Sequence, residues 1–289
     1  MQENREISAL FTLIDDPDEN IFSSVSERIV DYGKLIIPNL EHLWETTPSP
    51  EVQERIELLI HRLHYTDLLT DLGEWANSAY HDLLFGALLV AKFQYPELQT
   101  TPVLQEIEKI RRNVWLELNS FLTPLEQANV LSSILYNYYN LKGVEIGYAN
   151  PDDFFIQKVI QSKKGNALSN GILYLVLGSM LDIPVRAINI PKQFVLAFFN
   201  SDFDPADYSG NPQNHIQFYV DATTGQPFSH KDVENYFKRI AVPPVPSYFK
   251  PLSNKKIIRS LLEELSKCFS APGQLYKQNE LLHLVELLD

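Results

Sequence analysis

Residues 163–186, KKGNALSNGILYLVLGSMLDIPVR, predict the helix around which the rest of the chain is built. Apolar residues fall on nearly every side of a 3.6-residue period, which is typical of a helix that is buried all round. Asn166 is a good N-cap, and Asp182-Ile183-Pro184 ends the helix, because a residue before proline disfavours helical geometry. We therefore expect a buried helix over residues 167–181.

The period of the apolar residues changes from 3.6 to 2 after this helix. β-Branched and aromatic residues fill three short runs, at residues 185–190, 194–199 and 216–220. Such runs predict three antiparallel strands, and a layered arrangement would bury the helix against one face of their sheet.

The segment before this core, residues 6–95, predicts helices whose ends carry prolines. Pro17 and Pro50 begin two amphipathic segments, the first of which ends near Pro38, because a missing N–H costs least at a helix terminus. The two prolines lie 33 residues apart (50 minus 17), a spacing that favours two stacked HEAT-like helix pairs; an irregular helical bundle is the alternative. Residues 75–93 predict a third helix that packs these pairs onto the core.

Helices are also predicted on both sides of the core strands. They fall at residues 103–122, 125–139 and 152–161, and, after the proline-rich connector AVPPVP at 241–246, at 253–269 and 274–288. The expected fold class is α+β and mostly α. We predict three domains: an N-terminal helical domain at residues 1–97, the core at 98–245 and a C-terminal helix pair at 246–289.

Composition excludes several classes of function. The 289 residues include 24 basic and 37 acidic ones, and the net charge of -13 argues against nucleic acid as a partner, since phosphates require a basic surface. No apolar run reaches the roughly 18 residues of a membrane span, and the acidic N-terminus lacks the apolar stretch of a signal peptide. The single cysteine, Cys268, fits a reducing compartment, so we expect a cytoplasmic protein.

Motifs on both sides of the buried helix carry a family resemblance. Residues 163–166 (KKGN) precede the helix and residues 182–186 (DIPVR) follow it, with further matches at 148–154 (YANPDDF), 190–196 (IPKQFVL) and 219–221 (YVD). In this order and spacing the motifs resemble the SirB-type branch of the transglutaminase-like, papain-like cysteine superfamily. The resemblance covers roughly residues 120–289. It implies a papain-like core followed by a tetratricopeptide-like helix pair.

The same resemblance assigns the catalytic positions of the superfamily. Its enzymes use a cysteine at the start of the central helix, a histidine on the next strands and an aspartate that orients the histidine. These positions correspond here to Ala167, Gln193 and Asp221. A methyl group cannot attack a carbonyl, and a glutamine amide cannot act as a general base near neutral pH. The resemblance therefore implies a degenerate active site.

Other reactive residues have structural interpretations beside the functional ones. His215 begins the strand that leads to Asp221, and a regular strand would place Tyr219 on the same face; an ordinary exposed strand edge is the alternative. Ser169, one turn into the helix, is expected to satisfy backbone groups at the helix start. As candidates for a remnant cleft we keep Asn166, Ser169, His215, Tyr219 and Asp221.

No cofactor or metal site is predicted. Asp202, Asp204 and Asp207 share one loop, but the spacing lacks the glycine and the terminal glutamate of an EF-hand loop. His61 and His64 share one helix face without a third ligand nearby in the sequence.

Three hypotheses of function follow. The first is a non-catalytic cytosolic scaffold or protein-interaction module with a protein partner. The second is a small-molecule hydrolase or ligand-binding protein that uses the remnant cleft around Asp221, and the third places function in the N-terminal helices alone. A plugged cavity over Ala167, Gln193 and Asp221 would favour the scaffold, whereas an open cavity would keep the second hypothesis alive.

Overall fold

The computed structural model describes residues 2–208 and 210–289, and its contacts divide the chain into two compact units, Met1–Glu74 and Trp75–Asp289. The sequence-based boundaries lie instead after residues 97 and 245. The structural division differs because α5 (Leu83–Lys92) and α11 (Asn254–Ser266), which the sequence assigned to flanking domains, both pack on the central helix α9 (Ala167–Met180) inside the second unit.

The first unit is helical. Its elements are α1 (Gln2–Thr12), α2 (Glu19–Asp31), the short 3-10 helix η1 (Gly33–Ile36), α3 (Ile37–Thr46) and most of α4 (Pro50–Asn77). Pro50 begins α4 as predicted, whereas Pro38 lies in the first turn of α3 and does not end a helix. Proline is tolerated there because the first N–H groups of a helix have no intrahelical acceptor. The HEAT-like relation between the two segments stays a prediction.

Apolar residues from the α1–α2 loop, α2, η1, α3 and α4 bury one another in the first unit. The buried members of this core are Ile14, Phe22, Val25, Ile29, Ile36, Ile37, Leu40, Val52, Ile56, Leu59 and Leu63.

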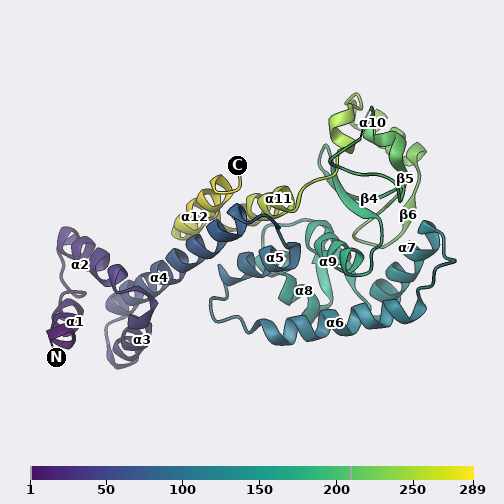
Figure 1. Ribbon diagram of the computed structural model, residues 1–289. Coiled ribbons are helices and arrows are strands. Elements are labelled where there is room, and N and C mark those ends of the chain that lie inside the picture. The colour runs from purple at the N-terminus through teal and green to yellow at the C-terminus, as the bar shows by residue number, and fades with distance from the viewer. Residues whose placement is uncertain (1, 209) are drawn as a thin grey trace. The chain divides into compact units, whose positions relative to one another are not determined.

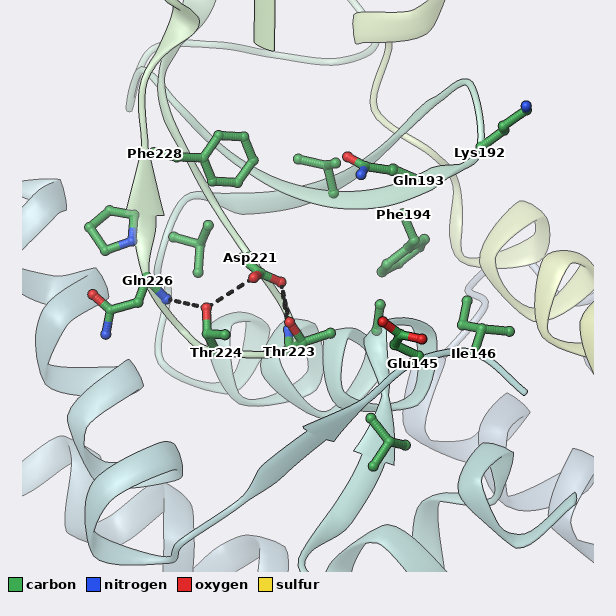
Figure 2. A pocket seen from close by; sticks show the side chains of 15 residues that line it. Glu145, Ile146, Lys192, Gln193, Phe194, Asp221, Thr223, Thr224, Gln226 and Phe228 are labelled. Carbon is green, nitrogen blue, oxygen red and sulfur yellow. Dashed lines mark hydrogen bonds between the residues drawn. The ribbon is translucent and has the colours of Figure 1, made fainter. Parts of the chain in front are cut away.

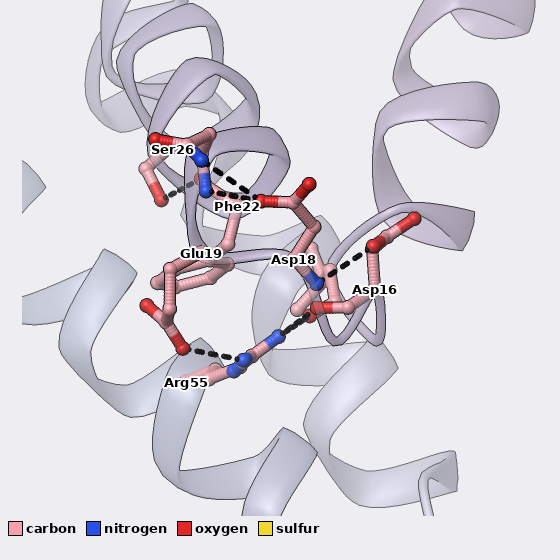
Figure 3. A network of polar contacts seen from close by, with 8 residues as sticks. Asp16, Asp18, Glu19, Phe22, Ser26 and Arg55 are labelled. Carbon is pink, nitrogen blue, oxygen red and sulfur yellow. Dashed lines mark hydrogen bonds and ion pairs between the residues drawn. The ribbon is translucent and has the colours of Figure 1, made fainter.

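Arg55 on α4 holds the loop between α1 and α2 (Figure 3). Its Nη1 donates hydrogen bonds to the carbonyl oxygens of Ile14 at 2.9 Å and Asp16 at 2.7 Å, and its Nη2 pairs with Glu19 at 3.0 Å. The guanidinium also lies over the ring of Phe22, 4.5 Å from the ring centroid. One planar cation therefore satisfies the backbone of a loop that has no regular structure of its own.

Replacing this guanidinium is expected to destabilise the first unit. Arg55→Met keeps the apolar stem against Phe22 but leaves the Ile14 and Asp16 carbonyls without their donor, so the free energy of unfolding should fall by about 2 kcal/mol. Arg55→Lys, the matched control, keeps the charge with a single donor group and should lose about half as much. Urea unfolding measures both changes; a loss in Arg55→Met no larger than in Arg55→Lys would contradict the role of the two carbonyl contacts.

The second unit contains the last residues of α4 and eight further α-helices among the described residues. Besides α5, α9 and α11 these are α6 (Thr100–Glu117), α7 (Pro124–Ser132), α8 (Ile156–Ser162), α10 (His230–Ile240) and α12 (Leu275–Glu286). The single helix predicted at residues 75–93 is wrong: the chain breaks after Asn77 and resumes at Leu83. The break is stabilised by Asp82, whose carboxylate accepts the N–H of Phe85 as an N-cap, and whose carbonyl accepts a bond from the Trp75 indole at 2.9 Å.

The central helix and its sheet form the core of the second unit. Asn166 caps α9, which confirms the predicted start, and the helix is buried along most of its length. The sheet is antiparallel in the order β3 (Val185–Ile190), β4 (Gln193–Phe199), β5 (Ile216–Val220) and β6 (Pro227–Phe228). α9 lies against one face, and α10 covers the other through Val233 and Phe237 (Figure 1).

The predicted sheet had three strands, and the fourth was missed. β6 is only two residues long and begins with a proline, so it carries no alternating pattern. A second, two-stranded sheet was also missed: β1 (Lys142–Val144) pairs in parallel with β2 (Lys164–Asn166), the segment that directly precedes the central helix. This pair leads the chain straight into the first turn of α9.

The C-terminal helices are attached to the core by polar contacts as well as by packing. The Leu252 N–H donates to the Ala187 carbonyl of β3 at 2.8 Å, and the Asn254 amide donates to the His81 carbonyl at 2.8 Å. α11 packs on α5 and α12. Its buried residues at i, i+4 and i+8, Ile257, Leu261 and Leu265, provide the apolar stripe.

Gln157 on α8 is the least satisfied polar group of this core. The residue is 2% exposed, and neither amide atom has a hydrogen-bond partner among the described residues. A buried amide without partners costs about 1–3 kcal/mol, so Gln157→Met, of similar shape, is expected to raise the free energy of unfolding by about 1–2 kcal/mol. Gln157→Glu, which buries a charge at the same place, should lower it. Chemical denaturation of the two variants tests this; destabilisation by methionine would show that the amide is satisfied in the folded protein.

None of the described helices combines the length and the apolar character that crossing a bilayer requires.

Candidate functional site

The start of α9 is built by a reciprocal cap. The Asn166 Oδ1 atom accepts the N–H groups of Leu168 and Ser169, both at 3.0 Å, and the Ser169 hydroxyl accepts the Asn166 N–H at 3.1 Å. The same hydroxyl donates to the Asp153 carbonyl at 2.6 Å, so Ser169 has the structural role predicted for it. Gly165 is required because a Cβ there would lie 2.4 Å from Asn170 Oδ1. These contacts fix Ala167, half-buried, as the first residue of the helix.

A cavity of about 680 Å³ lies over Ala167. Figure 2 shows the side chains that line it. One wall comes from the chain after β1, a second from the start of β4 and the end of β5, and a third from the turn between β5 and β6 together with β6. The three positions that correspond to a catalytic triad, Ala167, Gln193 and Asp221, all line it. The other lining residues are Val144, Glu145, Ile146, Lys192, Phe194, Val195, Val220, Thr223, Thr224, Gln226, Pro227 and Phe228.

The carboxylate of Asp221 is engaged by its own turn. Oδ1 accepts the backbone N–H of Thr223 at 2.8 Å and its hydroxyl at 2.7 Å, and Oδ2 accepts the hydroxyl of Thr224 at 3.0 Å (Figure 2). The Asp221 carbonyl accepts the Gly225 N–H at 2.7 Å. Asp221 therefore closes the link between β5 and β6 as an Asx-type turn and orients no histidine.

This turn is held from outside by Tyr136. Residues Ser133–Tyr138 form a π-helix, η2, in which the Tyr139 N–H bonds the Ile134 carbonyl at 2.9 Å. The Tyr136 hydroxyl donates to the Ala222 carbonyl at 2.6 Å, and its ring fills the space over Gly225, where a Cβ would lie 2.3 Å from the ring. The sequence predicted an ordinary helix over 125–139, so the π-helix and the contact of Tyr136 with the turn were not predicted.

Gly143 brings the first wall against the same turn. A Cβ on Gly143 would lie 2.3 Å from the Thr223 carbonyl oxygen and 2.6 Å from its Cα. The backbone of β1 therefore approaches the β5–β6 turn more closely than any residue with a side chain allows. Two close contacts therefore hold the β5–β6 turn that lines the cavity, one from Tyr136 and one from Gly143.

Two of the predicted cleft residues lie elsewhere. The prediction that Tyr219 shares a face with Asp221 is wrong: Tyr219 is fully buried, and its hydroxyl contacts His230 Nδ1 at 3.1 Å on the side of α10. Burial raises the pKa of the Tyr219 hydroxyl well above its usual value. His215 ends the short helix η4 (Pro212–His215), just before β5, and its ring packs on Phe203, with centroids 5.1 Å apart. The alternation of side chains along β5 does not extend to Asp221, because the strand ends at Val220 and the chain turns at the next residue.

The cavity lacks the side chains of thiol or serine chemistry. Among the described residues that line it, none is cysteine, serine or histidine. Cys268 lies in the short helix η6 (Lys267–Phe269), outside this lining, and burial raises the pKa of its thiol to about 11. The Thr223 and Thr224 hydroxyls donate to Asp221 and cap the turn. The lining offers hydrogen bonds, carboxylates and apolar walls, which are means of binding.

Several lining residues were missed by sequence reasoning. Glu145 and Ile146 lie in a loop without periodicity, and nothing in the sequence marks their approach to the core. The stretch Asp221-Ala222-Thr223-Thr224-Gly225 did carry a turn signal, since Asp, Thr and Gly in this order favour an Asx-type turn. That signal would have placed Thr223 and Thr224 beside Asp221.

The comparison with known families agrees with this arrangement. The family model described as the transglutaminase-like superfamily matches residues 101–263, more than half of the chain, and its match includes α9, the sheet and all three triad-equivalent positions. The chain belongs to the transglutaminase-like superfamily. The predicted resemblance is confirmed at this level, together with the α+β, mostly α fold class.

Among known proteins, this transglutaminase-like chain is similar to SirB1 and to UPF0162 proteins. It is similar to the Protein SirB1 of Salmonella typhimurium, at 20% identity over 193 residues, which cover 66% of this chain and 67% of SirB1. It is also similar to a UPF0162 protein of Pseudomonas aeruginosa, at 24% over 202 residues and 66% of each chain. A UPF0162 protein of Vibrio cholerae matches at 28% over 116 residues, 40% of this chain and 43% of its own length. The chain thus spans between 43% and 67% of these relatives, and no solved structure matches it.

Proposed function

We propose that this transglutaminase-like protein is non-catalytic and acts as a protein-interaction or regulatory module, with the cavity over Ala167 as the place where a partner binds. The observation that carries the proposal is an open cavity lined by Ala167, Gln193 and Asp221. The resemblance assigns the first two positions to the nucleophile and the base, and they hold a methyl group and an amide. Such a cavity leaves room for a bound group, and among residues 6–208 and 210–289 neither a thiol nor an imidazole lines it.

The chemistry argues in the same direction. Removing the nucleophile of a cooperative triad costs on the order of a million-fold in rate. Here Gln193 stands at the position of the base as well, and the Asp221 carboxylate already accepts three hydrogen bonds from its own turn. The names of the similar proteins, SirB1 and UPF0162 protein, state no activity.

The alternative hypothesis divides into two parts. A hydrolase of the thiol or serine type would need a cysteine or serine nucleophile and a histidine base, none of which occurs in the described part of the cavity lining, and the two residues that were expected to help, His215 and Tyr219, lie outside it. Binding needs only the cavity, so the open cavity supports that part. We place the protein in the cytoplasm as part of the proposal, on its single cysteine.

Two measurements test the proposal. Purified protein is expected to show no peptidase, deamidase or amide cross-linking activity; an activity that Asp221→Ala abolishes in a folded protein would overturn the non-catalytic assignment. A photo-crosslinking residue at Gln193 is expected to give one adduct in cells, whereas the same residue at Asn189, exposed on β3 and outside the cavity lining, gives none. Equal adducts at both positions, or none at Gln193, would contradict partner binding at the cavity.

A further inference from the structure

The two carboxylates in the cavity lack a paired cation. Glu145 and Asp221 both line it, and no ion pair to either carboxylate occurs among the side chains of residues 6–208 and 210–289. The one cation of the lining, Lys192, sits at the tip of the β3–β4 hairpin, and its side chain points away from Asp221 (Figure 2). The interior of the cavity is therefore acidic.

The walls beside these carboxylates are aromatic and fixed. The Phe194 ring packs on α9 so closely that a Cβ on Gly171 would lie 2.5 Å from it. The Phe228 ring stacks on Tyr219, with centroids 5.4 Å apart and planes at 22°. The faces of such rings carry negative partial charge and attract cations, arginine more often than lysine. Rings that are already immobilised lose little further freedom on binding.

The two carboxylates differ in what they still offer. Asp221 already accepts three hydrogen bonds, which hold it in one orientation. Glu145 is exposed, and the described part of the chain gives it no hydrogen bond, so both of its oxygens are free. Two free oxygens on one carboxylate match the paired N–H groups of a guanidinium, which an ammonium cannot reproduce.

From these three features we infer that the cavity takes an arginine side chain of a partner protein. Glu145 receives the guanidinium fork, Asp221 adds negative potential from the opposite wall, and Phe194 and Phe228 flank the planar cation and its apolar stem. The inference rests on the proposed function and names the chemistry of its partner.

A protein segment fits this site better than a free cation does. The cavity is open at the surface, and Ile146 and Tyr148, 41% and 42% exposed, lie on the loop that forms its first wall. Ile146 and Tyr148 provide apolar contacts for the residues on either side of the arginine in the partner segment. The net charge of -13 also favours approach of a basic segment.

Binding of capped pentapeptides to the full chain tests the inference. The probes are Ac-Ala-Val-Arg-Val-Ala-NH2 and the same peptide with lysine or with citrulline, the neutral analogue of arginine, in the centre, measured by titration calorimetry. The arginine peptide is expected to bind about tenfold more tightly than the citrulline peptide and about fivefold more tightly than the lysine peptide. Equal affinities of the arginine and citrulline peptides, or of the arginine and lysine peptides, would overturn it.

A matched pair of variants locates the contact. Glu145→Gln should remove the preference for arginine over citrulline to within about twofold, because the amide offers only one acceptor oxygen. Glu234→Gln, a change of another exposed glutamate, on α10 and outside the cavity lining, should leave the tenfold preference intact. Preference retained in Glu145→Gln would exclude the proposed contact, and methylguanidinium binding as tightly as the peptide would exclude a protein segment.

Failure of this inference differs from failure of the proposed function. A crosslinked partner at Gln193 whose captured segment lacks arginine would overturn the inference and leave partner binding standing. Selective peptide binding without any crosslinked partner in cells would support the site chemistry and count against the interaction role.

Discussion

The double variant Ala167→Cys/Gln193→His is expected to carry a thiol that iodoacetamide alkylates at pH 7 roughly 100-fold faster than it alkylates Cys268. Ala167 is the first residue of α9 and lines the cavity together with Gln193. A thiol at a helix N-terminus beside an imidazole titrates near pH 7 or below, because the helix dipole and a protonated histidine both stabilise the thiolate.

The size of the expected difference follows from two opposing effects. The pKa of Cys268, raised by burial to about 11, leaves a thiolate fraction of about one in 10,000 at pH 7, against about one half for a thiol of pKa 7. The more acidic thiolate is intrinsically less nucleophilic, by about 100-fold over four pKa units, and this offsets half of the gain on a logarithmic scale. The rate at the introduced thiol should level off above about pH 7, whereas the rate at Cys268 should keep rising until about pH 11.

Peptide-resolved mass spectrometry separates the two thiols in one sample. The single variant Ala167→Cys, which has the helix terminus but no imidazole, serves as the control and should react at an intermediate rate. If the introduced thiol in the double variant reacts no faster than Cys268, the helix start and the β4 position do not form a common site. Restored reactivity would show that the architecture lacks only sulfur and imidazole.

The second large effect is expected from Gly143→Ala, which should lower the free energy of unfolding of the second unit by about 3 kcal/mol. The new methyl group would meet the carbonyl oxygen and Cα of Thr223 at 2.3 and 2.6 Å. These are backbone atoms of a turn that Asp221 and Tyr136 hold in place, so no flexible side chain can move aside. Either β1 must leave β2, or the turn must leave Tyr136.

Gly147→Ala is the matched control for this variant. Gly147 lies four residues further along the same segment, and a Cβ there meets nothing within 4 Å. Its stability should change by less than about 0.5 kcal/mol. Equal stability of the two variants in thermal and urea unfolding would contradict the close approach of β1 to the β5–β6 turn.

Much of the core could be predicted from local pattern. The central helix begins at Ala167 as expected, because Asn166 is a strong cap, and ends one residue earlier than expected, at Met180. β3 and β5 have the predicted bounds, and β4 starts one residue earlier, at Gln193. In each case the signal lies within a few residues of the element that it specifies.

Features that depend on distant contacts could not be predicted. The two-residue strand β6 exists because Phe228 pairs with Tyr219, and the π-helix brings Tyr136 to a turn almost ninety residues later in the chain. The helix α10, with its capping box at Ser229 and Asp232, did carry a local signal that was overlooked. The break after Asn77 was hidden by apolar residues that continue through it.

The candidate site was predictable in part. Ala167, Gln193 and Asp221 are far apart in the sequence, and the structure places them around one cavity. Their correspondence to a catalytic triad stays a prediction. Glu145 was not foreseen, because a loop without periodic residues gives no sign of which side chain reaches the cavity. Tyr219 was grouped with Asp221 because the alternation of β5 was extended to residue 221, although the strand ends at Val220.

The attachment of the C-terminal helix pair bears on how the gene can change. Leu252 and Asn254 bond to residues of β3 and of the α4–α5 link, and α11 packs against α5. Recombination could not exchange or remove such a segment without loss of stability, because its removal would expose the parts of β3 and α5 that it covers. The C-terminal forty residues should therefore be retained together with the core, whatever partner the protein binds.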